Sequence, residues 1–374
     1  INTADEVANF LNERKKDLLI ATIVPATDSA FKKFVNENKK PLWVKEKDKI
    51  RQVSVSLYTE MSLIDKNGNE QIKVSNGEIV PKASLVNVSN PANTTYKNED
   101  YFAKAKNLNK GEVYVSPVTG WYVNRVEFDK GKRFSGIVRF ATPLFGKEGF
   151  AGVISLALDA RHLAGYTDHV IPTQAAPVYE ADASTGNYAF MVDNKGFIIS
   201  HPYDYHIEGL YSNGMPVPAL TQASSAEMTK KGEEVLNLNL LSFIDPNMPE
   251  VAKDATAGKS GIKMYKFGGH TKFVAYAPIK FFTKETPEPG GFGWIGMGLD
   301  VEKFNELAIK TTKNIEKEAK AWTTTIILIL TVSVVILFLI LALLARGITR
   351  SIESEVPKGS EGEGHFYDDE EEDK

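Results

Sequence analysis

Apolar residues recur at every third or fourth position through the first 40 residues, with Lys, Glu and Asn between them. Val7, Leu11 and Leu18 belong to this stripe. The spacing is typical of an amphipathic helix that buries one face. Pro25 lacks a backbone donor and should kink this helix or divide it in two. We therefore predict a long N-terminal helical segment over residues 1–44.

A second apolar stretch lies near the other end of the chain. Residues 321–345 contain no charged side chain, and most of them are Ile, Leu, Val or Phe. A helix of this length rises about 1.5 Å per residue and can cross a hydrocarbon core of about 30 Å. Trp322 marks one edge, where indole rings prefer the membrane interface. We predict one transmembrane helix over 321–345, entered from a juxtamembrane helix over 306–320.

Between these ends, one pattern of short apolar segments occurs twice. Residues 63–68 and 191–196 each run from an apolar strand into an Asp-x-x-Gly turn. In such a turn the Asp side chain caps its own backbone, and Gly supplies a positive φ. Residues 149–159 and 291–300 form a matching pair of closing strands, and each ends on an Asp before a helical pattern. The order of these matches indicates an internal repeat.

The fold class that follows is α+β: a long N-terminal helix, two modules with antiparallel sheets, and one transmembrane helix. We place the modules at residues 45–165 and 166–305. Arg346 and Arg350 directly follow the span, and the positive-inside rule puts them in the cytoplasm. Residues 310–320 before the span are also Lys-rich, so the rule does not decide alone. Because most of the chain precedes the span, we expect residues 346–374 in the cytoplasm and the bulk of the chain outside it. Export of such a domain needs a signal or a first transmembrane helix, which we expect ahead of this sequence.

Composition limits the classes of function. Apolar residues make up 43% of the chain and charged residues 25%, the balance of a folded protein. The net charge is −4 and no basic stripe runs through the body, which argues against a nucleic-acid partner. Cysteine is absent, which excludes thiol catalysis, disulfides and Cys-bound metals and favours a prokaryotic chain. The acidic run at residues 368–373 is typical of a disordered tail.

No pattern for catalysis or for a bound metal stands out. His201 and His206 are five positions apart without a third ligand, which is a weak metal signal. Histidines bonded to backbone at a strand end are the better interpretation. No Gly-x-Ser-x-Gly or His-Glu-x-x-His run is present. We therefore predict no enzyme, no metal site and no cofactor in this chain.

The order of these features resembles the double Cache sensor domain of prokaryotic chemoreceptors and sensor histidine kinases. The resemblance is carried by residues 100–102, 111–117, 141–143 and 201–202. After the span, residues 345–352 resemble the entry to a HAMP linker, with Ser351 where a proline is usual. The resemblance implies a membrane-distal PAS-like module at 45–165 and a membrane-proximal one at 166–305. It also implies a homodimeric receptor, in which the apolar face of the N-terminal helix would form the dimer interface.

The resemblance also indicates which ligands are not expected. Many members that bind amino acids use an Arg-x-Trp-Tyr run, a later Tyr and Asp, and an Asp in the closing strand of the distal module. In this chain Glu99 stands at the Arg position and Ala157 at the closing Asp, while Val118 and Gly120 lie where the Tyr and Asp would be. We therefore do not expect that mode of amino-acid recognition.

The remaining side chains near these positions are aromatic and mixed in charge. We predict six of them as ligand-binding residues: Tyr101, Tyr114, Trp121, Tyr122, Arg125 and Arg139. A pocket of aromatic rings with a guanidinium suits a small organic anion or an aromatic acid. The alternative is that these residues belong to the core and hairpins of an ordinary sheet.

The predicted function is extracytoplasmic sensing of a small molecule by a membrane-anchored receptor. Its transmembrane helix would pass the signal to a cytoplasmic output domain or partner. The alternative is a surface-exposed structural or adhesive membrane protein that uses the same modules without signalling. Binding of a small ligand distinguishes the two.

Overall fold

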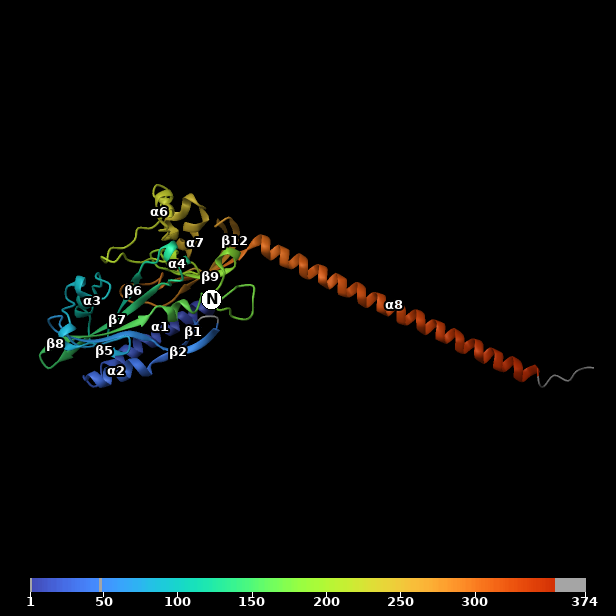
Figure 1. The fold of residues 1–374 in the computed structure, drawn as a ribbon, viewed down its shortest axis with the longest axis horizontal. Helices are drawn as coiled ribbons and strands as arrows, with labels where there is room; N and C mark the ends of the chain where they lie inside the picture. The colour runs from blue at the N-terminus through green and yellow to red at the C-terminus, as the bar shows by residue number, and fades with distance from the viewer. Residues whose placement is uncertain (1, 47–48, 354–374) are drawn as a thin grey trace, which may run out of the picture. The chain divides into compact units, whose positions relative to one another are not determined.

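The computed structural model describes residues 2–46 and 49–353, so most of the predicted acidic tail lies outside the described residues. The chain divides into two units, Ile1–Phe304 and Asn305–Lys374. The helices are α1 (Asn2–Ala21), α2 (Asp28–Glu37), α3 (Tyr101–Lys106), α4 (Arg125–Asp129), α5 (Arg161–Ala164), α6 (Ser225–Lys231), α7 (Asn247–Thr256) and α8 (Val301–Glu353) (Figure 1). The strands are β1 (Lys39–Glu46), β2 (Lys49–Ser56), β3 (Tyr58–Asp65), β4 (Glu70–Ser75), β5 (Glu78–Ile79), β6 (Tyr114–Trp121), β7 (Ser135–Gly146), β8 (Gly149–Asp159), β9 (Tyr188–Asp193), β10 (Ile198–Ser200), β11 (Gly261–Phe267), β12 (His270–Ile279) and β13 (Gly293–Asp300).

Two sheets of equivalent topology form the body of the chain. The first sheet has the strand order β5-β4-β3-β8-β7-β6, and the second has the order β10-β9-β13-β12-β11. All neighbouring strands in both sheets are antiparallel. In each sheet the opening strand, β3 or β9, lies beside the closing strand, β8 or β13. The predicted α+β class with antiparallel sheets is confirmed.

The Asp-x-x-Gly turns have the same geometry in both sheets. One carboxylate oxygen of each Asp accepts hydrogen bonds from the amides two and four positions on, at 2.8 and 2.9 Å for Asp65 and at 2.9 and 2.8 Å for Asp193. The glycines of the turns adopt φ values of +90° at Gly68 and +96° at Gly196, a conformation that side chains disfavour. The turns therefore join β3 to β4 and β9 to β10 in the same way.

A second pair of glycines sits where each closing strand meets the opening strand. Gly152 of β8 pairs with Asp65, and Gly293 of β13 pairs with Asp193. A Cβ at either glycine would lie 2.1 Å from a carbonyl oxygen of the neighbouring strand. The same steric constraint at equivalent points shows that the repeat in the sequence is a repeat in the structure.

Helix α1 lies against both sheets. Its buried stripe includes Val7, Leu11 and Leu18, which share one core with Phe140 of β7 and Ile295 of β13. Because side chains alternate along a strand, the other face of each sheet forms a separate core, under α3 in the first sheet and under α7 in the second. Figure 1 shows α1 and α2 on one side of the first sheet and α3 on the other.

The N-terminal helical segment is divided in two around Pro25, as predicted, but it does not extend to residue 44. α1 ends at Ala21, and α2 starts at Asp28, where the Thr27 side chain caps the new helix. Residues 39–46 form strand β1, which pairs with β2; Pro41 lacks the N–H that a helix interior requires. The apolar face of α1, which supported the homodimer prediction, is buried against the chain's own sheets.

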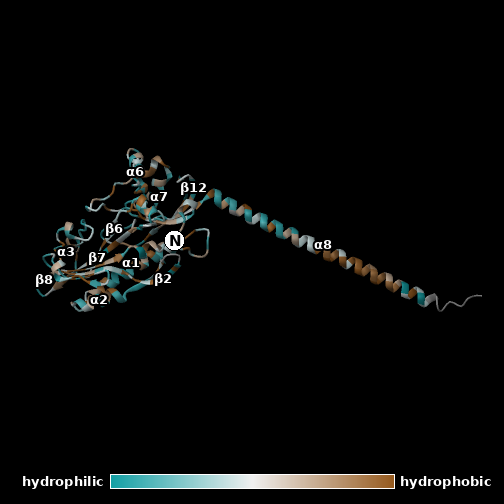
Figure 2. Ribbon diagram, in the orientation of Figure 1, coloured by the Kyte–Doolittle hydropathy of each residue, from teal (hydrophilic) through white to brown (hydrophobic). Residues whose placement is uncertain are grey.

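Helix α8 is continuous over Val301–Glu353. Among the described residues, it is long and apolar enough to cross a membrane, and the side chains of its most apolar stretch are not buried by protein. Figure 2 shows the apolar stretch within α8 with hydrophilic turns before and after it. The span predicted at residues 321–345 lies within α8.

We predict that Gly152→Ala and Gly293→Ala each lower the free energy of unfolding by about 2 kcal/mol or more, because the new Cβ meets a backbone oxygen. Gly146→Ala is the matched control, since its Cβ would lie 3.7 Å from the nearest atom and should cost less than about 0.5 kcal/mol. Urea unfolding of the full chain in detergent micelles, followed by tryptophan fluorescence, measures all three. Equal losses of unfolding free energy in the three variants would contradict the close contact of Gly152 and Gly293 with the neighbouring strand.

Candidate functional site

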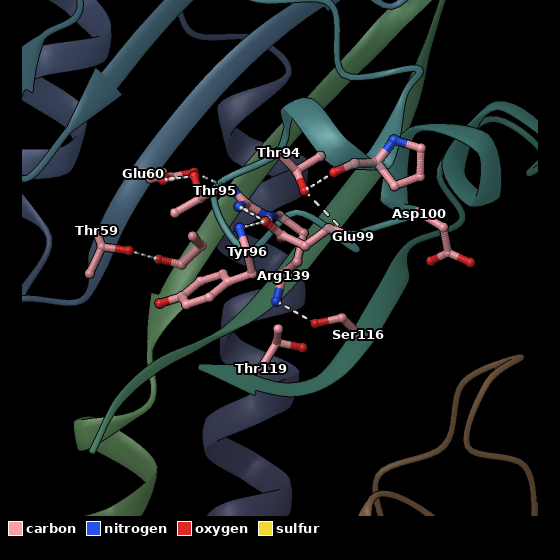
Figure 3. A network of polar contacts seen from close by, with 12 residues as sticks. Thr59, Glu60, Thr94, Thr95, Tyr96, Glu99, Asp100, Ser116, Thr119 and Arg139 are labelled. Carbon is pink, nitrogen blue, oxygen red and sulfur yellow. Dashed lines mark hydrogen bonds and ion pairs between the residues drawn. The ribbon is translucent and has the colours of Figure 1, made fainter. Parts of the chain in front are cut away.

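Arg139 lies in the middle of β7 with 1% of its surface exposed. Its guanidinium donates two hydrogen bonds to the carboxylate of Glu99, from Nε at 2.9 Å and from Nη2 at 3.2 Å. Nη1 donates to Oε2 of Glu60 at 2.9 Å. Figure 3 shows the three side chains converging from separate parts of the chain. Two carboxylates therefore hold one guanidinium, and Glu99 does so in the bidentate geometry that Arg favours.

The local fold fixes the position of Arg139. Glu60 lies on β3, and β8 separates β3 from β7, so the two side chains reach across one strand. The register between β6 and β7 shifts between Val115 and Val118. At this irregularity the backbone amide of Arg139 donates a hydrogen bond to Oγ of Ser116 at 2.8 Å.

Further polar groups extend the network behind Glu60. Thr95 Oγ1 donates to Glu60 Oε1 at 2.6 Å, and Lys73 Nζ lies 3.9 Å from Glu60 Oε2. Burial disfavours the charged form of Glu60, but attraction to Arg139 and Lys73 outweighs it and lowers the pKa of Glu60. Attraction to Glu99 and Glu60 likewise holds the pKa of Arg139 well above its usual value despite burial. The pairing therefore favours the ionised forms of both Glu60 and Arg139.

A cavity of about 310 Å³ lies beside this network, and we call it the first cavity. One wall comes from the start of α3 and from β6, and the other from the Asp193 turn and the residues around Glu208. Its charged lining consists of Glu99, Asp100, Asp193, Glu208, Arg139 and Lys195. Carboxylates outnumber cations in this lining, and Arg139 is already paired with Glu60 and Glu99.

The two acidic groups on the second wall titrate near neutral pH. Burial raises the pKa of Asp193 to about 6, against the stabilising hydrogen bonds of its turn. Burial, with repulsion from Asp193, raises the pKa of Glu208 to about 7. A positively charged group between them would favour their ionised forms.

Three of the six residues predicted from the sequence line the first cavity: Tyr101, Tyr114 and Arg139. The guanidinium of Arg139 lies 4.7 Å from the ring centroid of Tyr101, within the range of cation–π attraction. Tyr114 Oη donates to Oδ1 of Asp100 at 3.2 Å. These side chains thus form the Arg139 end of the cavity.

The structure does not bring the other three residues to this cavity. The ring of Trp121, at the end of β6, lies 5.2 Å from that of Tyr96. Tyr122 Oη donates to the carbonyl of Tyr205 at 3.0 Å, and Arg125 lines a different cavity. The structure thus separates the six residues, because the chain leaves the first sheet after Trp121 and continues among residues around the second sheet.

Sequence reasoning missed the groups that give the first cavity its charge. Glu99 departs from the family pattern, but no sequence pattern distinguishes Glu60 or Lys73 from other charged residues. Asp193 was identified only as a turn residue, and Glu208 was not identified. The internal repeat was the available clue, since it showed that the Asp193 turn is a defined element.

The two neighbouring histidines are satisfied by the backbone, as expected. His201 Nδ1 accepts from the amide of Tyr203 at 2.8 Å, and His206 Nδ1 lies 3.0 Å from the carbonyl oxygen of Glu234. Within residues 2–46 and 49–353, no group of three or more His, Asp or Glu side chains is arranged to hold a metal ion.

No protein-family model matches the chain, and no curated protein matches it. Its structure is similar to ligand-binding domains of bacterial chemoreceptors, the class of protein that the sequence resemblance implies. One is that of CtaA from Pseudomonas fluorescens with L-leucine, at 14% identity over 80% of this chain and 91% of that chain, with a TM-score of 0.42. Another is that of PctC from Pseudomonas aeruginosa with GABA, at 13% identity over 80% and 95%, with a TM-score of 0.41.

We predict that Arg139→Met lowers the free energy of unfolding by about 3–5 kcal/mol, because it leaves two buried carboxylates without a counter-charge. The control is Arg133→Met, whose partner Glu180 is well exposed and whose loss should cost less than about 1 kcal/mol. Urea unfolding of the full chain measures both. Adding Glu60→Gln and Glu99→Gln to Arg139→Met should recover most of the lost free energy of unfolding. If the triple variant is no more stable than Arg139→Met, unpaired buried carboxylates are not the cause of the loss.

Proposed function

We propose that this chain is the extracytoplasmic sensory part of a membrane receptor and that the first cavity binds its small-molecule ligand. The observation that carries the proposal is a cavity of about 310 Å³ with charged walls from both sheets. A ligand in this position contacts both sheets at once, and binding is then coupled to their relative arrangement. The chain itself performs no catalysis in this proposal.

The charges around the first cavity favour a ligand that carries a positive group. Arg139 does not offer a free cation to an organic anion, because Glu60 and Glu99 occupy three of its donors. Asp193 and Glu208 instead lie on the opposite wall, and within residues 2–46 and 49–353 no lysine or arginine forms an ion pair with either carboxyl. An amine with further hydrogen-bonding groups is therefore the ligand class that we propose here, in place of the organic anion inferred from the sequence.

A continuous element connects the first cavity with α8. Asp193, on the cavity wall, is paired with Gly293 at the start of β13. β13 runs to Asp300, and α8 begins at the next residue. Oδ1 of Asp300 accepts a hydrogen bond from the backbone amide of Lys303 at 2.8 Å and so caps the helix. We propose that a shift of the Asp193 turn is passed along β13 to α8, and through the membrane to a cytoplasmic output domain or partner.

The membrane orientation and the assembly belong to the same proposal. Most of the chain precedes the span, which favours an extracytoplasmic body; the Arg residues after the span agree with this orientation, whereas the Lys-rich residues 310–320 oppose it. A homodimer remains a prediction from the family resemblance, and the buried face of α1 is not its interface.

We predict that an amine such as agmatine raises the thermal midpoint of the full chain in lipid nanodiscs, because it binds the folded state alone, and that succinate does not. The affinity should rise about tenfold between pH 6 and pH 8. Glu208, with a pKa of about 7, is ionised in only about a tenth of the molecules at pH 6, and the cation needs the ionised form. Calorimetric titration at several pH values measures this dependence.

Matched variants locate the site. Glu208→Gln should weaken amine binding and flatten its pH dependence, whereas Glu227→Gln, at an exposed position of α6, should leave both unchanged. A shift with succinate but with no amine would contradict the proposed ligand class. No shift with either class of ligand would favour the structural or adhesive alternative.

A further inference from the structure

A second and larger cavity, of about 510 Å³, lies on the second sheet, and we call it the second cavity. Its walls include Tyr188 of β9, Lys272 of β12, and Tyr203 and Tyr205 of the segment after β10. The rings of Tyr203 and Tyr205 lie 5.2 Å apart and are stacked at 15°. The second cavity is therefore walled by aromatic rings and shares no residue with the lining of the first cavity.

Lys272 is a buried amine at the floor of this cavity, with 3% of its surface exposed. Its Nζ donates to Oη of Tyr188 at 2.8 Å. It also lies 4.0 Å from the ring centroid of Tyr188 and 5.5 Å from that of Phe267. In the described part of the chain no carboxylate forms an ion pair with it. One of its three ammonium protons has a hydrogen-bond acceptor in the protein, which leaves donors for a ligand.

Burial of an ammonium group without a paired carboxylate costs free energy, and a Met of similar length would fill the same space without this cost. Burial accordingly lowers the pKa of Lys272 to about 7, against the attraction of Asp300. A group that brings a negative charge into the second cavity would remove this cost by pairing with Nζ.

The rim of the second cavity carries a second cation. The guanidinium of Arg125 lies 5.1 Å from the ring centroid of Tyr205 and is about half exposed. Its Nη1 lies 3.6 Å from Oε2 of Glu234, a buried atom without a hydrogen-bond partner. This separation is too long for a hydrogen bond. Nη2 of Arg125 donates to Oη of Tyr205 at 3.5 Å, and the remaining donors of the guanidinium can turn to a ligand.

We propose that the second cavity binds a small planar carboxylic acid, with its carboxylate on Lys272 and its ring between the aromatic walls. This chemistry is opposite to that of the first cavity, and it matches the aromatic acid that the sequence suggested for a pocket containing Arg125. The site is separate from the first cavity and does not depend on the function proposed for it.

The repeat supports the position of this site. Lys272 pairs with Asp300 and Ile137 pairs with Asp159, at the ends of the two closing strands. Lys272 is therefore the counterpart of Ile137, which lies two residues before Arg139 and on the same face of its strand. Each sheet thus presents a buried cation on the equivalent face, but only the cation of the first sheet is neutralised by the protein.

The second cavity also reaches the start of α8. His270, which lines this cavity, forms a hydrogen bond to the carboxylate of Asp300 through Nδ1. Asp300 caps α8 through the amide of Lys303. A ligand here would therefore contact β12 at the point where the second sheet joins the helix.

Calorimetric titration of the full chain in lipid nanodiscs tests the proposal with indole-3-acetate and its uncharged isostere indole-3-acetamide. We expect the acid to bind at least tenfold more tightly than the amide. Lys272→Met should reduce the affinity for the acid at least tenfold without lowering the thermal midpoint, because the variant removes a buried charge. Glu208→Gln, in the first cavity, should leave binding of the acid unchanged. A failure of the proposed acid site can therefore be distinguished from a failure of the proposed amine site.

Three results would overturn the proposal: equal affinities for the acid and the amide, wild-type affinity in Lys272→Met, or no binding of the acid at millimolar concentration. If Lys272→Met does not fold, the Arg125→Met variant tests the proposal instead. Its side chain is half exposed, so the variant should fold, and it should weaken binding of the acid severalfold while leaving that of the amide unchanged. Unchanged binding of the acid in Arg125→Met would likewise overturn the proposal.

Discussion

A buried guanidinium needs a counter-charge beside it, and the ion pairs of Arg139 with two glutamates join separate parts of the first sheet next to the first cavity. Glu60 reaches it across β8, and Glu99 reaches it from the turn before α3. Breaking such a network leaves a buried charge, which costs far more than the loss of an exposed ion pair. The loop that carries Glu99 is therefore bound to the sheet by charge as well as by the apolar core under α3.

The same network is the reason for the ligand class that we propose for the first cavity. A free arginine would attract an anion, but this arginine is already held by two carboxylates. The charge that remains available comes from Asp193 and Glu208 on the opposite wall. In the second sheet the situation is reversed, because Lys272 is buried without a carboxylate ion pair among the described residues and its neighbours are rings. In our proposal the two sheets thus provide cavities of opposite charge preference, and both adjoin the proposed path to α8.

Much of the fold could be predicted from the sequence because its signals are local. The Asp-x-x-Gly turns, the closing strands and the apolar span each have a short pattern that the structure reproduces. The site was less predictable, because the partners of Arg139 are far away in sequence: Glu60 is 79 positions from it and Glu99 is 40. Burial and pairing at such separations leave no periodic pattern. The end of the N-terminal helix was also misplaced, because pairing with β2 stabilises β1 and is not visible in the apolar stripe.

The central claim is that a ligand in the first cavity acts on α8 through β13. Hydrogen exchange of the full chain in nanodiscs, followed by mass spectrometry with and without a bound amine, tests it most directly. Our account predicts slower exchange at the cavity segments, residues 98–120 and 193–210, together with altered exchange at residues 293–310. Protection limited to the cavity segments, with residues 293–310 unchanged, would contradict it.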